Sequence, residues 1–267
     1  MAKSPTRRDL DNLDRAQELI YDAWDAKSPA KREALAKAAL DISGLCADAY
    51  LILADGQRRG SKRRTELICA ARDAGRSALG EKLFAELTGE FWLHLETRPY
   101  MRACHYLVID LQERNELPAA SVLMREMLTL NPSDNQGIRY LLCDALIAQG
   151  KNDEARRLLT DYKEDTSANF QWNIVLLSFR KSGSSPKTLT ALKNALKENG
   201  FVPWYLTGRS KIPKKMSQFL ELGGKSEAAS YARYAIVSWT NTPGAIDWLR
   251  KEIDPRVLVD GPTSGRN

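Results

Sequence analysis

The sequence predicts an all-α fold in which helical hairpins stack on one another as an α-solenoid. One helix-turn-helix pattern occurs twice within residues 101–162 at a period of about 34 residues, and a third copy begins at Asn169. Apolar residues also recur at spacings of three and four in the segments before and after these copies. Two ordinary amphipathic hairpins are the alternative for the first two copies, but three consecutive matches at similar offsets favour a repeat.

Two helical hairpins are predicted before residue 80. The first pairs residues 9–26 with residues 29–43, because Ser28 and Pro29 have the residue types typical of an N-cap and a first helical position. The second pairs a helix that begins near Ala47 with a helix over residues 62–79. We expect residues 1–8 to be a disordered N-terminus, residues 9–253 to form a single solenoid, and residues 254–267 to be a disordered tail.

The segment over residues 80–100 departs from the repeat spacing. Gly80, Gly89 and Pro99 interrupt a series of aromatic and leucine residues, which predicts a short helix and an extended connection that packs aromatic side chains onto the stack. His94 and Glu96 lie two residues apart and His105 follows on the next helix, but two histidines with one carboxylate make a poor metal-ligand set. The sequence therefore predicts no metal site.

The repeated hairpins place small residues where two helices cross closely. Ala120 and Ala155 occupy the same offset in the first two copies, and Asn115 and Gly150 suit their turns because both residue types tolerate a positive φ. The pattern ends near residue 199. Two more helices, over residues 225–239 and 243–253, are expected to form a C-terminal helical cap, with Pro243 as the first helical residue of the second.

The offsets of these copies resemble the tetratricopeptide repeat. Its pattern has a large residue, a leucine, a small residue and an aromatic on the first helix, and an alanine, an aromatic, an alanine and a final proline on the second. Leucine and methionine replace some of the aromatic residues here, so the repeats are degenerate. The resemblance implies a right-handed α-solenoid that serves as a non-enzymatic scaffold or adaptor and binds a peptide or a partner helix on its concave face.

Several segments are also similar to a narrower group, the suppression-of-tumorigenicity-7 family and its short bacterial relatives. The residues that carry this resemblance lie in five segments: 96–102, 131–140, 202–206, 226–232 and 244–246. Animal members of that group resemble membrane proteins, and this chain lacks their spans, so membrane residence is not expected. Gly200 and Phe201 also replace the polar pair usual before Val202. The resemblance implies no catalytic residues.

Composition and motifs exclude several classes of protein. No apolar stretch of about 18 residues is present, and the first ten residues lack the apolar region of a signal peptide, so a cytoplasmic location is expected. The four cysteines are widely spaced on apolar helical faces, where they are expected to be core residues. Phosphate loops, nucleophile elbows and zinc motifs are absent from the sequence, which predicts neither an enzyme nor a cofactor.

The tetratricopeptide resemblance implies a set of residues on the concave face. Of these, Tyr140 and Phe170 are possible anchors, although Phe170 and Ile109 can instead pack between repeats. Arg102 and Arg139 lie near helix starts, where the helix dipole disfavours a cation, so each needs an acidic partner such as Glu96, Asp134 or Asp144, or else forms an anion site. The residues predicted to bind a partner are Arg102, His105, Gln112, Tyr140, Asp144, Asn173 and Arg180.

Two other functions remain open at this point. A net charge of +6 and two basic runs favour a nucleic-acid binder, with RNA as the ligand, although solvated loops are the simpler interpretation. An enzyme would instead need Glu96, Arg98 and His105 to meet in one pocket under residues 91–100. The two basic runs cover residues 58–64 and 209–215. Their residues predicted to bind an anion or nucleic acid are Arg58, Arg59, Lys62, Arg63, Arg64, Lys211, Lys214 and Lys215.

Overall fold

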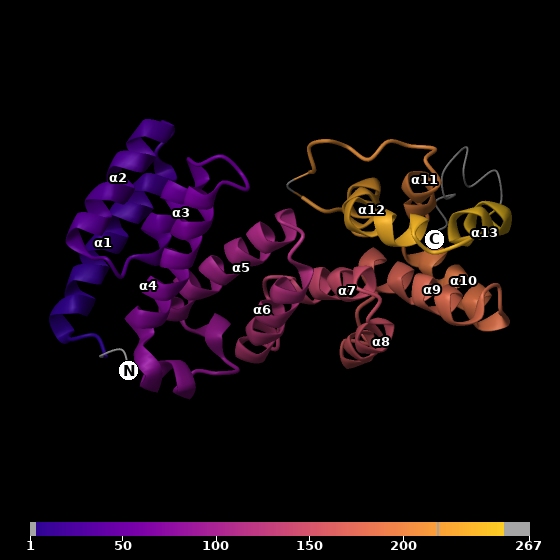
Figure 1. Ribbon diagram of the computed structural model, residues 1–267, viewed down its shortest axis with the longest axis horizontal. Helices are drawn as coiled ribbons and strands as arrows, with labels where there is room; N and C mark the ends of the chain where they lie inside the picture. The colour runs from indigo at the N-terminus through magenta and orange to yellow at the C-terminus, as the bar shows by residue number, and fades with distance from the viewer. Residues whose placement is uncertain (1–3, 218, 254–267) are drawn as a thin grey trace, which may run out of the picture. The chain divides into compact units, whose positions relative to one another are not determined.

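The computed structural model describes residues 4–217 and 219–253, and all its regular elements are helices (Figure 1). This confirms the predicted all-α fold. The chain divides into two compact units, Met1–Ile138 and Arg139–Asn267. The expected single solenoid over residues 9–253 therefore stays a prediction, and the predicted tail over residues 254–267 lies outside the described residues.

The first unit consists of three helical hairpins, which pair α1 with α2, α3 with α4, and α5 with α6. Two 3₁₀ turns, η1 and η2, connect the second hairpin to the third. The bounds are α1 (Arg7–Asp25), α2 (Pro29–Ile42), α3 (Ala47–Asp55), α4 (Lys62–Glu86), η1 (Phe91–Leu93), η2 (Leu95–Thr97), α5 (Arg98–Glu113) and α6 (Leu117–Leu130).

Short polar residues fix where several of these helices begin. Ser28 caps α2 and is followed by Pro29, as predicted, and Ser61 caps α4. Helix α1 begins two residues earlier than expected, because the Thr6 side chain accepts a hydrogen bond from the backbone N–H of Asp9, whose carboxylate accepts one from Thr6 in return. Part of the segment expected to be disordered is therefore helical.

The connection between the second and third hairpins is more compact than predicted. Gly80 has a φ of 66°, which interrupts α4, but the helix resumes and reaches Glu86. The two 3₁₀ turns then replace the predicted extended connection. Phe91 is fully buried and packs edge-on against Phe84 and Tyr100, which confirms that this segment packs aromatic side chains onto the hairpins.

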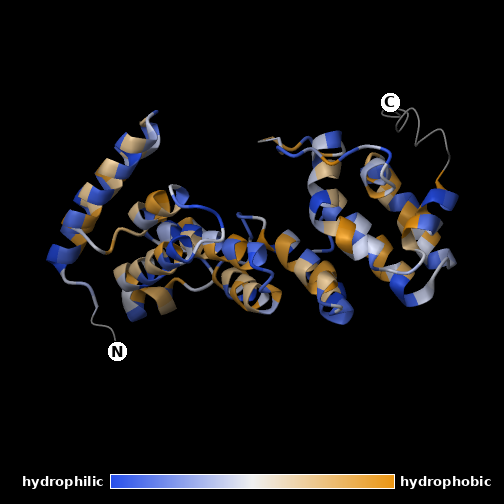
Figure 2. Ribbon diagram, turned by 45° about the horizontal axis from the view of Figure 1, so that its top comes forward, coloured by the Kyte–Doolittle hydropathy of each residue, from blue (hydrophilic) through white to orange (hydrophobic). Residues whose placement is uncertain are grey.

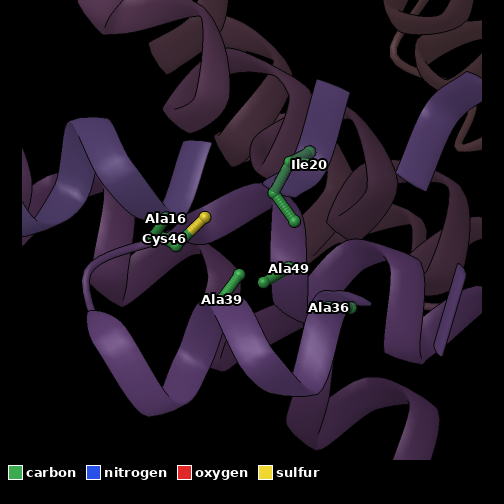
Figure 3. Close-up of a cluster of buried hydrophobic side chains, with 6 residues drawn as sticks. All are labelled: Ala16, Ile20, Ala36, Ala39, Cys46 and Ala49. Atoms are coloured by element: carbon green, nitrogen blue, oxygen red, sulfur yellow. The ribbon is translucent and has the colours of Figure 1, made fainter. Parts of the chain in front are cut away.

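Small side chains form the core between the first three helices. Alanines on α1, α2 and α3 meet there around one larger residue, Ile20 (Figure 3). Because alanine keeps helix axes close, this composition suits tight hairpin packing. Figure 2 shows hydrophobic and hydrophilic residues mixed along the helices, as expected when only one face of each is buried. The cluster comprises Ala16, Ile20, Ala36, Ala39, Cys46 and Ala49.

The second unit contains two further repeat hairpins and a C-terminal group of helices. Gly150, with a φ of 73°, forms the turn between α7 and α8, and α9 packs against α10. The bounds are α7 (Ile138–Ala148), α8 (Asn152–Asp161), α9 (Ala168–Ser182), α10 (Pro186–Glu198), α11 (Val202–Leu206), α12 (Lys225–Thr240) and α13 (Ala245–Glu252).

Helix α12 packs along α9. Trp172 of α9 and Trp239 of α12 are both fully buried, and their ring centroids lie 6.3 Å apart. The two predicted C-terminal helices are present, but Pro243 is not the first helical residue of α13, because Gly244 follows it with a φ of 74° and the helix begins at Ala245. Their role as a cap stays a prediction.

The four cysteines are not all core residues. Cys46, Cys104 and Cys143 are buried as expected, whereas Cys69 is exposed on α4 and is not a core residue. None of the helices in the described ranges combines the length and the apolar character needed to cross a membrane.

Candidate functional site

A groove of about 1060 Å³ lies within the first unit, between α1 and the segment formed by α4, η2 and α5. The α1 side contributes two exposed aromatic residues, Tyr21 and Trp24, which retain 50% and 44% of their accessible surface. Their ring centroids are 5.7 Å apart. Leu95 of η2, which is also exposed, faces the same groove. The groove therefore gathers several exposed large apolar side chains, whereas such residues normally lie singly on a protein surface.

Arg102 is the predicted partner-binding residue that lines this groove. Its guanidinium lies 5.4 Å from the centre of the Trp24 ring, and its Nε donates a hydrogen bond of 2.8 Å to Oδ1 of Asp48. Asp48 belongs to α3 and is almost completely buried. The pair holds α5 against α3 and fixes the arginine beneath the indole, so Arg102 has an acidic partner that the sequence pattern did not single out.

The charges around the groove are balanced. Arg98 is held in place because its guanidinium donates to the backbone oxygen of Trp92 and stacks on that ring, with 5.2 Å to the centroid. Four basic and four acidic side chains line the groove, which leaves no net charge to select an anion or a cation. They are Arg7, Lys82, Arg98 and Arg102, and Asp11, Asp14, Glu86 and Glu96.

Two other predicted partner-binding residues of the first unit lie away from the groove. His105 is partly buried, and burial lowers the pKa of its imidazole while the nearby Asp134 carboxylate acts in the opposite direction. Gln112 is also partly buried. Glu96 and Arg98 line the groove but His105 does not, so this groove does not bring together the three residues of the enzyme hypothesis.

In the second unit, predicted concave residues form a buried hydrogen-bond network. Asp144 of α7 accepts from the side-chain amides of Asn169 and Asn173, at 2.9 Å and 2.8 Å. Asn173 in turn accepts from the hydroxyl of Tyr231, which accepts from Trp239 Nε1. Asn173 has no exposed surface and Asp144 only 8%, so both are interior residues where the sequence pattern placed them on an open face. Helix α12 covers them, a contact that the repeat pattern does not contain.

Arg180 and Tyr140 are likewise engaged within the second unit. The Arg180 guanidinium donates to the backbone oxygens of Ile147 and Ser238 and to the side chains of Asn152 and Thr242, and burial lowers its pKa. Four neutral acceptors thus hold this cation between α7, α8 and the end of α12. The Tyr140 hydroxyl contacts Asp165 and Arg139, and its ring packs edge-on against Phe170 at 5.6 Å.

Neighbouring carboxylates contact most of the basic residues of the first run, and they offset its charge in part because most of these pairs are exposed to solvent. Arg59 pairs with Glu113, and Lys62 and Arg63 both pair with Glu66. Arg64 is buried between Asp55 and Asp110, at 4.0 Å and 3.9 Å, and is not available to a ligand. Arg58 is exposed at the same turn.

The second basic run belongs to the other unit. Lys211, Lys214 and Lys215 are exposed in the loop between α11 and α12. The backbone oxygen of Lys214 accepts a hydrogen bond from Arg233, which ties the loop to α12.

Comparison with known proteins agrees with the repeat pattern. A family model described as a tetratricopeptide repeat matches residues 111–173, from the end of α5 to the first part of α9. This stretch is tetratricopeptide-like. No curated protein and no solved structure matches the chain significantly. Tetratricopeptide repeats generally mediate interactions between proteins.

The groove residues of α1 were missed by the sequence analysis. Leu10 and Trp24 are among the apolar residues that recur at helical spacing in this helix, a pattern that predicts a core-facing side, yet both are exposed. Tyr21 follows Ile20 directly and lies three residues before Trp24, so it adds an aromatic residue next to the apolar face of α1. This was the one sign in the sequence that the apolar surface of α1 is wider than one hairpin can cover.

Proposed function

We propose that the protein is a non-enzymatic interaction scaffold and that its first unit binds a peptide segment or a helix of a partner protein in the groove between α1, α4 and α5. The observation that carries this proposal is the exposed pair Tyr21 and Trp24 inside the groove. Aromatic and arginine side chains supply most of the binding energy at protein interfaces, and here Arg102 lies against the indole of Trp24.

The chemistry of the groove indicates what the partner presents. Because the lining charges balance, the main gain on binding comes from covering aromatic and leucine surface. We therefore expect the partner to place large apolar side chains between Tyr21 and Leu95, with polar residues toward the rim. A helix that presents such side chains at spacings of three and four meets this requirement, as does an extended segment with alternate apolar residues.

The finer sequence predictions belong to the same proposal. These are a right-handed, continuous solenoid with a C-terminal cap, a cytoplasmic location and a relationship to the suppression-of-tumorigenicity-7 family. One segment of that resemblance has a clear structural role: Asp134 adopts a φ of 49°, and its carboxylate accepts a 2.7 Å hydrogen bond from the backbone N–H of Ile138 at the start of α7.

Affinity capture with groove variants tests the proposal. The bait is the full chain, used with native lysate at low and moderate salt, with and without nuclease. We expect a stoichiometric protein on the beads that is reduced at least tenfold by the double variant Tyr21→Ala, Trp24→Ala. The matched control is Tyr234→Ala, which removes an aromatic residue of similar exposure, 47%, from α12 in the other unit.

Two outcomes would contradict the proposal. Equal capture of the same protein by the wild type and the groove variant would place its binding site elsewhere. If only RNA or DNA were recovered and were lost when the salt concentration is raised, the function would be nucleic-acid binding through the basic runs at residues 58–64 and 209–215.

A further inference from the structure

A second cavity, of about 480 Å³, lies within the second unit between α8 and α9, and the start of α10 closes one end of it. The residues of α8 that line it recur at helical spacing, as do those of α9, so each helix turns one continuous face toward the cavity. Phe170, one of the two possible anchors, is among its lining residues, whereas Arg102, Arg180 and the other residues predicted to bind a partner or an anion are not. It is also independent of the groove in the first unit.

The walls of this cavity carry an excess of positive charge. Arg156, Lys163, Lys181 and Lys187 come from three successive helices and the turn after α8. The one carboxylate in the lining, Asp165, already accepts hydrogen bonds from Arg139 and Tyr140.

Two of these cations have no carboxylate of the described residues paired with them. Lys181 and Lys187 are exposed and make no ion pair with any residue that the structure describes. Arg156 is positioned over the cavity, because its Nη2 donates to the backbone oxygen of Leu177 on α9. Its other contact is with Asp153, whose side chain is 85% exposed and lies outside the lining. Solvent weakens that pair, so it neutralises the guanidinium only in part.

The floor of the cavity is apolar. Phe170, Leu177 and Leu159 line it with 1%, 2% and 7% of their surface exposed, and the partly exposed Ile174 is the apolar lining residue most open to a ligand. At the α10 end, the Ser185 hydroxyl caps the helix and lies 2.9 Å from the hydroxyl of Thr188. The cavity thus combines cations at its rim with hydrocarbon at its base.

We propose that this cavity binds an acidic peptide segment. Carboxylate side chains of the peptide pair with Arg156, Lys181 and Lys187, and one aliphatic or aromatic side chain between them covers the floor. The charge excess of the lining is complementary to such a segment and steers it to the cavity. A bare phosphate would leave the apolar floor uncovered. A nucleic acid would find no aromatic face to stack on, because the ring of Phe170 is buried.

Fluorescence anisotropy on the full chain tests this site. The probe is a fluorescein-labelled peptide with the sequence Glu-Glu-Leu-Glu-Glu, and the comparison peptides replace either all four glutamates by glutamine or the leucine by serine. We expect saturable binding of the acidic probe at low salt that weakens at least tenfold with the double variant Lys181→Gln, Lys187→Gln. Each comparison peptide should bind at least fivefold more weakly than the probe.

The matched control removes the same net charge from a neighbouring surface. Lys193 and Lys197 are exposed on α10 and do not line the cavity, so Lys193→Gln, Lys197→Gln should leave the affinity within twofold of the wild type. Since all four lysines are exposed, both double variants should keep the thermal midpoint of the wild type. The Tyr21→Ala, Trp24→Ala variant should also bind the probe normally, which separates this site from the proposed groove.

Four outcomes would overturn the proposal. Equal weakening by the two lysine pairs would mean that the probe responds only to net charge. If the serine peptide bound as tightly as the probe, the apolar floor would not contribute to binding. If the glutamine peptide bound as tightly as the probe, the cations would not contribute. Displacement of the probe by a single-stranded oligouridylate that binds more tightly, through the same lysines, would identify the cavity as a nucleic-acid site.

Discussion

Asp144 is a carboxyl group surrounded by neutral partners, and burial raises its pKa to about 7. The side chains that face it are the amides of Asn169 and Asn173 and, one step further, the phenol of Tyr231. Between the unfolded pKa of about 3.9 and the folded value, the folded state binds more protons than the unfolded state. The free energy of unfolding should therefore decrease as the pH rises through this range and level off above pH 7.

The first prediction follows for Asp144→Asn. From pH 5 to pH 8 the wild type should lose on the order of 2 kcal/mol of stability relative to the variant, whose side chain does not ionise. Urea unfolding gives the free energy of unfolding of both proteins at pH 5 and at pH 8. The difference between wild type and variant is then compared between the two pH values, which cancels the contributions of other titrating groups, including His105. A constant offset between the two proteins at both pH values would show that Asp144 ionises in the folded state as it does in the unfolded chain.

A second prediction concerns the ion pair of Arg102 and Asp48. Arg102→Ala should reduce the free energy of unfolding by about 2 kcal/mol, because it leaves the Asp48 carboxylate buried without its cation. The double variant Arg102→Ala, Asp48→Ala should lose less than the sum of the two single variants, by about 1 kcal/mol or more. Denaturant midpoints of the four proteins give this coupling energy. Strict additivity would mean that the pair holds α5 to α3 only weakly.

At the scale of elements, the crossing of α4 and α5 depends on one glycine. A Cβ placed on Gly75 would lie 3.0 Å from the Cα of Tyr100 and 3.2 Å from its backbone nitrogen. Backbone atoms cannot rotate away, so Gly75→Ala must separate the two helices. Overpacking of this kind destabilises by about 1–3 kcal/mol, whereas the higher helix propensity of alanine returns up to about 1 kcal/mol.

We therefore predict that Gly75→Ala lowers the thermal midpoint, although it is a helix-favouring substitution. Ser77→Ala, two residues along α4, serves as the control for propensity alone and should leave the midpoint unchanged or raise it slightly, because alanine favours the helix more than serine does. An increase in the midpoint with Gly75→Ala would show that α4 and α5 can move apart without losing packing.

Helix starts were predictable where local chemistry determines them. Ser28 with Pro29 marks α2 in the sequence as clearly as in the structure, and the three repeat copies correspond to α5 to α10. The predictions failed where backbone conformation overrode residue type. Gly80 interrupts α4 without ending it, and Gly244 takes the left-handed conformation that shifts the start of α13 beyond Pro243.

The candidate site was less predictable because it depends on contacts between distant segments. The repeat offsets identify which residues of α9 lie on one face, but they do not show that α12, more than 50 residues later, covers that face through Tyr231 and Trp239. The exposure of Trp24 similarly depends on the distance between α1 and the start of α5, which no local pattern encodes.

For the whole molecule, the net charge of +6 overstates the charge available to a polyanion. In the first basic run, Arg59, Lys62 and Arg63 pair with glutamates and Arg64 is buried. The second run belongs to the other compact unit and offers three exposed lysines in one loop. In each run, therefore, phosphate binding depends mainly on the few cations that have no carboxylate paired with them.

The last prediction is the salt dependence of binding to duplex DNA. Four phosphate contacts would give a slope of about −3.6 in a plot of log affinity against log salt concentration, at roughly −0.9 per contact. We expect a shallower slope, nearer −2, from anisotropy titrations of the full chain with a labelled 20-base-pair duplex. Lys211→Gln, Lys214→Gln, Lys215→Gln should reduce it further, because these lysines have no acidic residue paired with them in the part of the chain that the structure describes. A slope of −3.6 or steeper that this variant abolishes would make nucleic acid the partner and the loop at residues 209–215 its binding site.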